Sequence, residues 1–278
     1  MMIRGATKLI CHIGYPTESF KAPMIYNPYF EKRGIDAVVV PIGCKADDYP
    51  EFLRLLFRLS NIHGALITMP HKVTTVGLLD KVSTAVKVAG ACNAVRLGTD
   101  GSLVGDMFDG EGFARGLSRK GLKLAGARAL VAGCGGVGSA IAASLAARGL
   151  AELGLYDPIE ATMSGLAGRL GQHYSGVKVS VGSSDPTGWD LVVNATPLGM
   201  TAKDPLPFDV SRLTRSTFVG EVVMTSEVTP LLAAARARGC QTQIGTDMLF
   251  EQIPAYLEFF GFPTATADEL REIAKISY

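Results

Sequence analysis

The stretch Leu130-Val131-Ala132-Gly133-Cys134-Gly135-Gly136-Val137-Gly138-Ser139-Ala140 decides the fold of this 278-residue chain. An apolar run stops at a glycine-rich turn, and the small residues up to Ala147 predict a helix after it. A second apolar run, Leu153-Gly154-Leu155-Tyr156, ends at Asp157. Strand, glycine turn, helix, strand and an acid about 20 residues on form the layout of a dinucleotide-binding crossover.

The glycine turn suits a pyrophosphate. Glycines let the backbone approach the ligand, and the following helix N-terminus offers free N–H groups and a positive dipole. The alternative is a tight turn that only packs a helix on a sheet. We predict cofactor binding by the five residues of the turn other than Cys134, namely Gly133, Gly135, Gly136, Val137 and Gly138.

Asp157 predicts which dinucleotide binds. A carboxylate at the end of the second strand can accept hydrogen bonds from the ribose hydroxyls, and it repels a 2′-phosphate. The segment Asp157–Thr162 contains no Arg or Lys that would neutralise such a phosphate. The sequence therefore favours NAD over NADP as cofactor. The alternative is that Asp157 merely caps the next helix.

Composition excludes several classes of partner. Hydrophobic residues make up 47% and charged residues 19%, as in soluble globular proteins. The net charge of +1 gives no nucleic-acid footprint, and no apolar run reaches membrane-spanning length. The N-terminus lacks a signal-peptide pattern. We expect a cytoplasmic protein, a monomer or homodimer, with a small-molecule substrate and with no nucleic-acid or membrane partner.

The cysteines and histidines predict neither disulfides nor a metal site. The five cysteines are scattered and odd in number, which fits reduced thiols. The four histidines have no ligand spacing. The residues concerned are Cys11, Cys44, Cys92, Cys134 and Cys240, with His12, His63, His71 and His173.

Alternating patterns predict an α/β fold along the whole chain. In the first half, buried strands at Lys8–Gly14, Ala37–Pro41 and Gly64–Met69 alternate with helices at Ala22–Arg33 and Tyr49–Leu59, which indicates a mostly parallel, covered sheet. Two short strands surround the turn Gly98-Thr99-Asp100-Gly101. Asp109–Lys120 is a predicted helix, and a domain boundary is expected near residues 110–125.

The second half continues as a wound sheet. Strands are expected at Val177–Val181, Leu191–Asn194 and Phe218–Val223. Thr229-Pro230 predicts a helix start, and Gly239 a helix end. The tail is predicted to be helical, with a break at Gly261-Phe262-Pro263, and Trp189 is expected to pack rather than to function.

Several motifs, in this order and spacing, resemble those of the shikimate dehydrogenase family, over essentially the whole chain. They are Thr68-Met69-Pro70-His71-Lys72, Gly90-Ala91-Cys92-Asn93-Ala94-Val95, Gly105-Asp106-Met107-Phe108-Asp109-Gly110, the glycine turn, Asn194-Ala195-Thr196-Pro197-Leu198-Gly199, Thr229-Pro230-Leu231-Leu232 and Gly245-Thr246-Asp247-Met248-Leu249-Phe250-Glu251-Gln252. The resemblance implies a substrate-binding α/β domain (1–110), a doubly wound, Rossmann-type dinucleotide domain (111–245) and C-terminal helices that return to the substrate domain (246–278).

The resemblance also implies site residues. Lys72 and Asp109 would form the catalytic pair. Without the resemblance, Lys72 would more often be a solvated residue at a helix start, and Asp109 would more often be a helix cap. Thr68, Asn93 and Gln252 would bind substrate. Beyond the glycine turn and Asp157, the implied cofactor-binding residues are Asn194, Ala195, Thr196, Val222, Gly245 and Met248.

Four substrate-pocket positions depart from the family pattern. Phe20 and Ala22 stand where the family has a Ser-x-Ser pair that binds the substrate carboxylate, Leu66 replaces an Asn, and Met224 replaces a Tyr. In addition, the usual Asn-Thr before the catalytic Asp is Met107-Phe108. Ser19 or Lys21 could bind a carboxylate instead, or could equally be surface residues. Burying polar substrate groups unpaired costs about 1–3 kcal/mol each, so shikimate itself is expected to be a poor substrate.

The sequence thus predicts an NAD-dependent oxidoreductase that moves a hydride between nicotinamide and a hydroxyl of a shikimate- or quinate-like cyclic hydroxy acid. One alternative is a divergent paralogue that acts on a less polar alcohol. Another is a nucleotide-sensing protein that kept the fold and lost catalysis, against which the retention of Lys72 and Asp109 argues.

Overall fold

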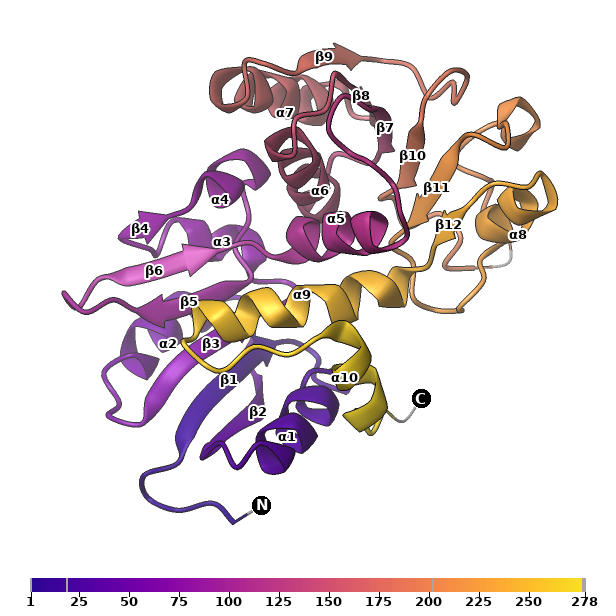
Figure 1. Cartoon of the computed structure of the whole chain (residues 1–278). Coiled ribbons are helices and arrows are strands. Elements are labelled where there is room, and N and C mark those ends of the chain that lie inside the picture. Colours follow the sequence, from indigo (N-terminus) through magenta and orange to yellow (C-terminus); the bar gives the residue numbers. More distant parts are fainter. Residues whose placement is uncertain (1, 19, 202, 277–278) are drawn as a thin grey trace. The chain divides into compact units, whose positions relative to one another are not determined.

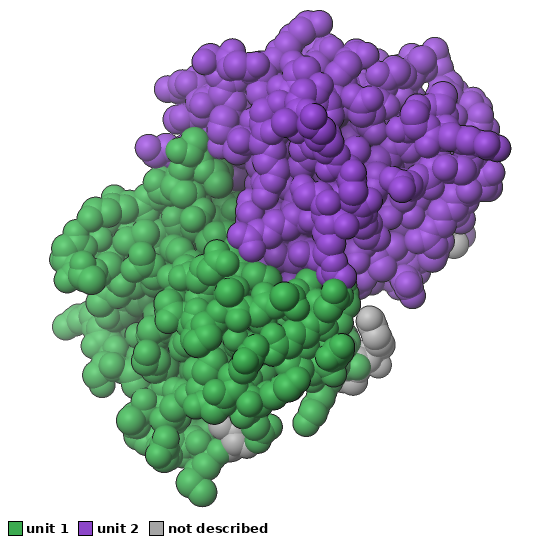
Figure 2. Space-filling view, viewed as in Figure 1, with its two compact units in different colours: residues 1–86, 90–108, 253–278 green, residues 87–89, 109–252 purple. Residues whose placement is uncertain are grey.

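The computed structural model describes residues 2–18, 20–201 and 203–276, and they form two compact units (Figure 2). Unit 1 comprises residues 1–86, 90–108 and 253–278, and unit 2 comprises residues 87–89 and 109–252. The domains predicted from the sequence, 1–110, 111–245 and 246–278, stay a prediction.

Unit 1 contains a six-stranded mixed sheet in the order β2-β1-β3-β5-β6-β4 (Figure 1). The strands β1, β2 and β3 are parallel, whereas β5 pairs antiparallel with both β3 and β6. The predicted covered parallel sheet is therefore correct for the first three strands, and the turn at Gly98–Gly101 makes the predicted hairpin. The strands are β1 Lys8–Gly14, β2 Ala37–Gly43, β3 Ile62–Ile67, β4 Lys81–Val82, β5 Ala94–Leu97 and β6 Leu103–Asp106.

The helices of unit 1 begin where the sequence supplies start signals. Proline stands in the first turn of both α1 and α2, and the Ser83 hydroxyl accepts a hydrogen bond from the Val86 N–H at the start of α4. The chain after Ile253 belongs to this unit, and there the Tyr29 hydroxyl donates to the Pro263 carbonyl at 2.7 Å. The helices are α1 Pro23–Lys32, α2 Tyr49–Leu56, α3 Lys72–Val76, α10 Ala267–Ile273 and the first half of α4 Thr84–Ala89, whose residues 87–89 belong to unit 2.

Unit 2 contains a fully parallel sheet in the order β12-β11-β10-β7-β8-β9, as expected for a doubly wound fold. The strands are β7 Arg128–Ala132, β8 Glu152–Tyr156, β9 Lys178–Val181, β10 Leu191–Asn194, β11 Phe218–Glu221 and β12 Thr242–Gln243. The helices are α5 Asp109–Arg119, α6 Gly136–Ala147, α7 Glu160–His173, α8 Pro230–Ala237 and the first part of α9 Gly245–Phe259, which belongs to unit 1 from Ile253 on, with a 3-10 turn at Val210–Arg212. After β8 and β9 on one side of β7, the chain crosses to β10 on the other side, and ligands bind at such switch points.

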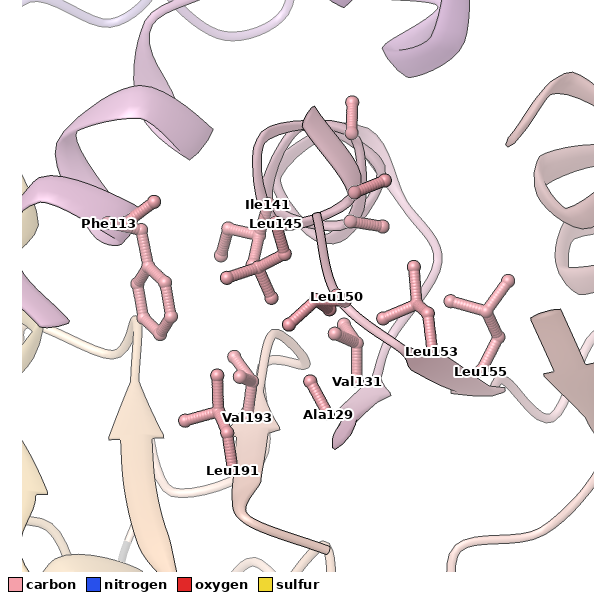
Figure 3. Packing of buried hydrophobic residues seen from close by; sticks show 14 of the residues in the cluster. Phe113, Ala129, Val131, Ile141, Leu145, Leu150, Leu153, Leu155, Leu191 and Val193 are labelled. Atoms are coloured by element: carbon pink, nitrogen blue, oxygen red, sulfur yellow. The ribbon is translucent and has the colours of Figure 1, made fainter. Parts of the chain in front are cut away.

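Alternation along the strands of unit 2 builds a core on each face of the sheet. On one face, Val131, Leu155 and Val193 pack against Ile141 and Leu145 of α6 (Figure 3). Each such buried aliphatic side chain stabilises the fold by roughly 1.5–3 kcal/mol. The opposite face holds a second cluster with α8, which includes Leu130, Val192, Val219, Leu231 and Leu232.

Trp189 packs, as predicted, at the edge of this second cluster. Its ring lies close to Gly154, and the Arg128 guanidinium carbon sits 4.9 Å from the ring centroid. The indole N–H donates to the Asp185 carbonyl at 3.1 Å. These contacts give Trp189 a structural role.

Candidate active site

The glycine turn of unit 2 packs so closely that two of its glycines admit no side chain. Gly133 has φ +95°, and a Cβ there would lie 2.6 Å from the Ala195 carbonyl oxygen. A Cβ on Gly138 would lie 1.8 Å from the Gly133 oxygen. Gly135 differs, because a Cβ there would meet nothing within 4 Å. The turn is therefore closely packed at Gly133 and Gly138 and open at Gly135. The open side is the shape that a pyrophosphate needs to approach the backbone.

The N-terminus of α6 supplies donors at this open side. The N-cap residue Gly135 makes no side-chain cap bond, and both Gly135 and Gly136 are exposed. The first N–H groups of a helix have no intrahelical partner and carry the positive end of its dipole. The predicted residues Gly135, Gly136 and Val137 thus have the geometry of an anion site.

Asp157 fastens the glycine turn to the end of β8. One carboxylate oxygen accepts from the Cys134 N–H at 2.8 Å, and the other accepts from the Ile159 N–H at 2.9 Å. The following helix, α7, has Ile159 as N-cap, without a side-chain cap bond. Asp157 is therefore not the N-cap of that helix. Each oxygen keeps a further lone pair that can accept a ribose hydroxyl.

Asn194 and Thr196 shape the loop after β10. The Asn194 Nδ2 donates to the Leu198 carbonyl at 2.8 Å, and its Oδ1 accepts from the Thr196 N–H and hydroxyl. Their side chains are therefore used within the loop, which presents its backbone around Ala195 next to Gly133. Cofactor contacts of these three residues stay a prediction.

Glu221, which the sequence analysis missed, joins three segments at the same edge of the sheet. Its carboxylate is fully buried and accepts from Asn194 Nδ2 at 3.0 Å and from the Thr229 hydroxyl at 3.0 Å. It also accepts from the backbone N–H groups of Val222 and Val223 at 2.9 and 3.1 Å. Burial raises the pKa of Glu221, and these hydrogen bonds oppose that shift. An acid that ends an otherwise apolar parallel strand was the available signal.

The start of α9 packs on the segment that follows Glu221. A Cβ on Gly245 would lie 2.3 Å from the Val223 carbonyl oxygen and 2.9 Å from Met224 Cγ. Met248, one turn on, is buried in the core cluster against which Val222 also packs. The structure therefore gathers Val222, Gly245 and Met248, and the cofactor binding that the resemblance implied for them stays a prediction.

Asp109 and Gln252 lie on two helices of unit 2 that touch backbone to backbone. A Cβ on Gly112 of α5 would lie 2.6 Å from Gln252 Cβ and from the Met248 carbonyl oxygen of α9. Ion pairs tie the same helices together: Arg119–Glu251 at 2.8 Å and Lys120–Asp247 at 2.7 Å.

Gln252 carries the sign of a ligand-binding side chain. Its Oε1 is buried and has no hydrogen-bond partner among the described residues. A buried polar atom without a partner is destabilising unless something pairs with it. Gln252 therefore has a buried acceptor that a ligand hydroxyl would satisfy, and its role in substrate binding stays a prediction.

Lys72 and Thr68 stand at the carboxyl end of the parallel strands of unit 1. The Thr68 N–H donates to the Ile13 carbonyl at 2.9 Å, so the segment after β3 is fastened to β1. Lys72 begins α3, and its carbonyl accepts from the Cys92 N–H at 2.9 Å. The catalytic pairing of Lys72 with Asp109, which belongs to unit 2, stays a prediction.

Asn93 connects this edge to the segment that leads to Asp109. Its side-chain oxygen accepts from the Phe108 N–H at 2.9 Å, and its carbonyl accepts from the Ile67 N–H at 2.8 Å. The Asn93 amide is thereby oriented, and only its Nδ2 can donate.

The altered pocket positions of unit 1 are apolar. Leu66 is buried on β3, in register with His12 of β1, and the Phe20 ring stacks on the His12 ring with centroids 4.1 Å apart. Ala22 is buried before α1. Ser19 lies outside the described residues, and Lys21 is half-buried.

Neither a metal cluster nor a spanning helix is found in the described part of the chain. No group of three or more His, Cys, Asp or Glu side chains there could hold a metal ion. No helix there has the length and apolar character needed to cross a membrane.

Comparison with known proteins decides the family. A family model described as the shikimate dehydrogenase substrate binding domain matches residues 12–95. The shikimate dehydrogenase (NADP(+)) of Rubrobacter xylanophilus is 36% identical over 254 residues, which cover 90% of this chain and 89% of the relative. The chain belongs to the shikimate dehydrogenase family. Relatives named shikimate dehydrogenase are dinucleotide-dependent oxidoreductases.

Two solved structures resemble this chain over nearly its whole length. Shikimate 5-dehydrogenase from Listeria monocytogenes, in complex with shikimate and NAD, superposes with a TM-score of 0.90 at 26% identity, covering 98% of each chain. The ligand-free 5-ketofructose reductase of Gluconobacter sp. strain CHM43 has a TM-score of 0.87 at 25% identity, covering 96% of this chain and 97% of the other. The predicted α/β fold, with a substrate-binding and a Rossmann-type part, is confirmed.

Proposed function

We propose that this shikimate dehydrogenase family member transfers a hydride between NAD and a ring hydroxyl of a shikimate- or quinate-like cyclic polyol. The observation that carries the proposal is the glycine turn that is packed behind Gly133 and Gly138 and open in front of Gly135. Bound NAD supplies the hydride acceptor. Gly135, Gly136 and Val137 would hold its pyrophosphate, and Asp157 its ribose.

Lys72 and Asp109 are proposed to handle the proton. As the substrate carbon loses its hydride, the hydroxyl proton needs an acceptor, and in the reverse direction the carbonyl oxygen needs a donor. Lys72 exchanges this proton, and the Asp109 carboxylate orients the Lys72 side chain. The Asn93 side chain accepts from the Phe108 N–H, which fixes the backbone directly before Asp109.

Asn93, Thr68 and Gln252 are proposed to bind the ring hydroxyls. The unpartnered Oε1 of Gln252 would accept from a substrate hydroxyl, and the Asn93 Nδ2 would donate to one. Ordered hydroxyl contacts hold the reacting carbon in place, which is a large part of catalysis by proximity.

NAD is proposed as the cofactor even though the curated relative is named for NADP. The Asp157 carboxylate supports this choice, because it carries a negative charge at the end of β8 and no Arg or Lys stands between Asp157 and Thr162. A 2′-phosphate there would meet charge repulsion without compensation. The neighbour crystallised with shikimate and NAD agrees with a family member that binds NAD.

The substrate range should include compounds other than shikimate. The neighbour named 5-ketofructose reductase acts on an uncharged ketose. A test panel therefore contains quinate, shikimate and 5-ketofructose, and NADH formation or consumption is followed by absorbance.

The test compares wild type with Lys72→Ala on this panel. We expect turnover of at least one compound by wild type, reduced by about 10²–10⁴-fold in Lys72→Ala. The exposed Lys87→Ala, on α4, is the matched control and should keep wild-type rates. NAD binding without turnover of any compound would contradict the proposal and favour a nucleotide sensor.

A further inference from the structure

Phe20 stands where the family pattern has a serine. It contributes to a small surface of unit 1, called the floor below, to which His12, Leu66 and Thr68 also belong. His12 and Gly14 of β1 point to one face of the sheet, and Leu66 of β3 lies in register with His12 on that same face. A Cβ on Gly14 would lie 2.4 Å from Thr68 Cγ2 and 2.8 Å from the tip of the Phe20 ring. Phe20 and Thr68 therefore meet at Gly14, where a side chain would not fit, and the Phe20 ring also stacks on His12.

His12 is the polar group of this floor. Its Nδ1 is buried without a hydrogen-bond partner among the described residues, while the residue as a whole is only partly buried. A buried N–H without an acceptor is rarer than an unpaired acceptor. The proton is therefore assigned to Nε2, which is the nitrogen left to donate to a ligand.

Lys72 lies close enough to His12 to affect its charge. Burial, and next the positive charge of Lys72, lower the pKa of His12 to about 4. The imidazole is therefore neutral at pH 7. A neutral imidazole donates to a hydroxyl or carbonyl oxygen but does not neutralise a carboxylate.

The Phe20 ring has the complementary effect. It stacks on His12 at 4.1 Å with an interplanar angle of 29° and offers only carbon atoms. A carboxylate against this ring would lose hydration without gaining a donor from position 20, which disfavours its binding there. An uncharged hydroxymethyl or keto group avoids that cost.

We propose that His12 and Phe20 are specificity-determining residues, and that the substrate presents an uncharged hydroxyl or carbonyl oxygen to His12 in place of a carboxylate. The substrate class is then an uncharged polyhydroxylated alcohol or ketone. This inference rests on the proposed hydride transfer and names its substrate class.

The test uses two matched compounds, shikimate and its hydroxymethyl analogue, in which the carboxylate is reduced to a primary alcohol. We expect wild type to have at least about a 10-fold higher kcat/KM for the hydroxymethyl analogue, corresponding to 1.4 kcal/mol. His12→Leu should lower kcat/KM for this analogue by about 10-fold or more, mainly through KM, and should barely change it for shikimate. His12→Gln, which returns an N–H near the position of Nε2, should restore part of the loss.

Two further variants complete the test. Phe20→Ser with Ala22→Ser should shift preference toward shikimate by about 10-fold or more. His63→Leu is the matched control, because His63 is another partly buried histidine of unit 1, held by the Phe260 carbonyl at 2.6 Å, and should keep the wild-type ratio.

The outcomes separate the inference from the function on which it rests. Lys72-dependent turnover with preference for shikimate would overturn the inference alone, as would an unchanged substrate ratio in His12→Leu. No turnover of either compound would contradict the proposed hydride transfer on cyclic polyols and this inference with it.

Discussion

The polar side chains at the carboxyl edges of the two sheets differ in how they are hydrogen-bonded. In unit 2, Asp157 and Glu221 spend their oxygens on backbone and side-chain donors of the protein itself. In unit 1, the Nδ1 of His12 is buried without a partner among the described residues, the Phe20 ring stacks on the imidazole, and Leu66 lies in register with His12 on β3. The edge of unit 2 is thus fixed by internal hydrogen bonds, whereas the edge of unit 1 carries apolar side chains where the family pattern has polar ones.

This difference teaches where a family can vary. Loops that approach a common cofactor need a fixed backbone, which buried hydrogen bonds provide. A substrate edge needs only to match one ligand, so exchanging polar for apolar side chains changes specificity while the fold is kept.

The largest expected effect comes from the proposed acid–base pair. Lys72→Ala and Asp109→Ala should each lower kcat by about 10²–10⁴-fold, because each removes a group that handles the same proton. The double variant should lose far less than the product of the two. Steady-state rates measure this, and NADH titration checks that the cofactor still binds. Near wild-type kcat in either single variant would refute the assignment.

The next effect tests the fixed edge. Glu221→Ala removes the acceptor of four buried donor groups, so we expect a loss of about 3 kcal/mol or more in the free energy of unfolding. The melting temperature should then fall by roughly 6–12 °C. Glu227→Ala, an exposed acid of the same segment, is the control and should change it little. Equal melting temperatures for both variants would show that the Glu221 network does not hold the loops.

A smaller effect concerns cofactor choice. Asp157→Ser combined with Pro158→Arg should move the ratio of kcat/KM for NAD over NADP by about 10²-fold toward NADP, the scale of one or two lost charge-assisted hydrogen bonds. Equal or better wild-type efficiency with NADP would show that Asp157 does not select the cofactor.

The smallest effect is a pH dependence of stability from the substrate edge. His12 has a pKa lowered to about 4, first by burial and then by Lys72, against an ordinary value of 6.5. Between these values the unfolded chain binds a proton that the folded protein does not, so stability falls as the pH drops from 6.5 to 4. His12→Leu should therefore lose less melting temperature than wild type between pH 7 and pH 5. Identical losses would place His12 in a solvated, unperturbed environment.

Local sequence patterns predicted much of this molecule, because the signals were local. The glycine turn, the acid after β8 and the Thr229-Pro230 start of α8 each lie within a few residues of what they determine. Glu221 was missed because its partners come from segments as far as 27 residues away, at Asn194. The helix α4 was missed because six residues give too little periodicity.

The substrate edge was only half predictable. Alignment with the family motifs identified Phe20 and Leu66 as departures, but only the fold brings His12 beside both, since register between β1 and β3 is a tertiary property. In the sequence, the spacing of His12 from the other histidines only argues against a metal site, and no local pattern marks His12 as a neighbour of Phe20.

The KM for shikimate, measured with NAD and wild-type protein, tests the contrast between the two edges most directly. A retained cofactor edge and an altered substrate edge predict saturation by NAD, with a KM for shikimate in the millimolar range or above. A micromolar KM for shikimate would mean that another group binds the carboxylate, and it would contradict this account of the pocket around His12 and Phe20.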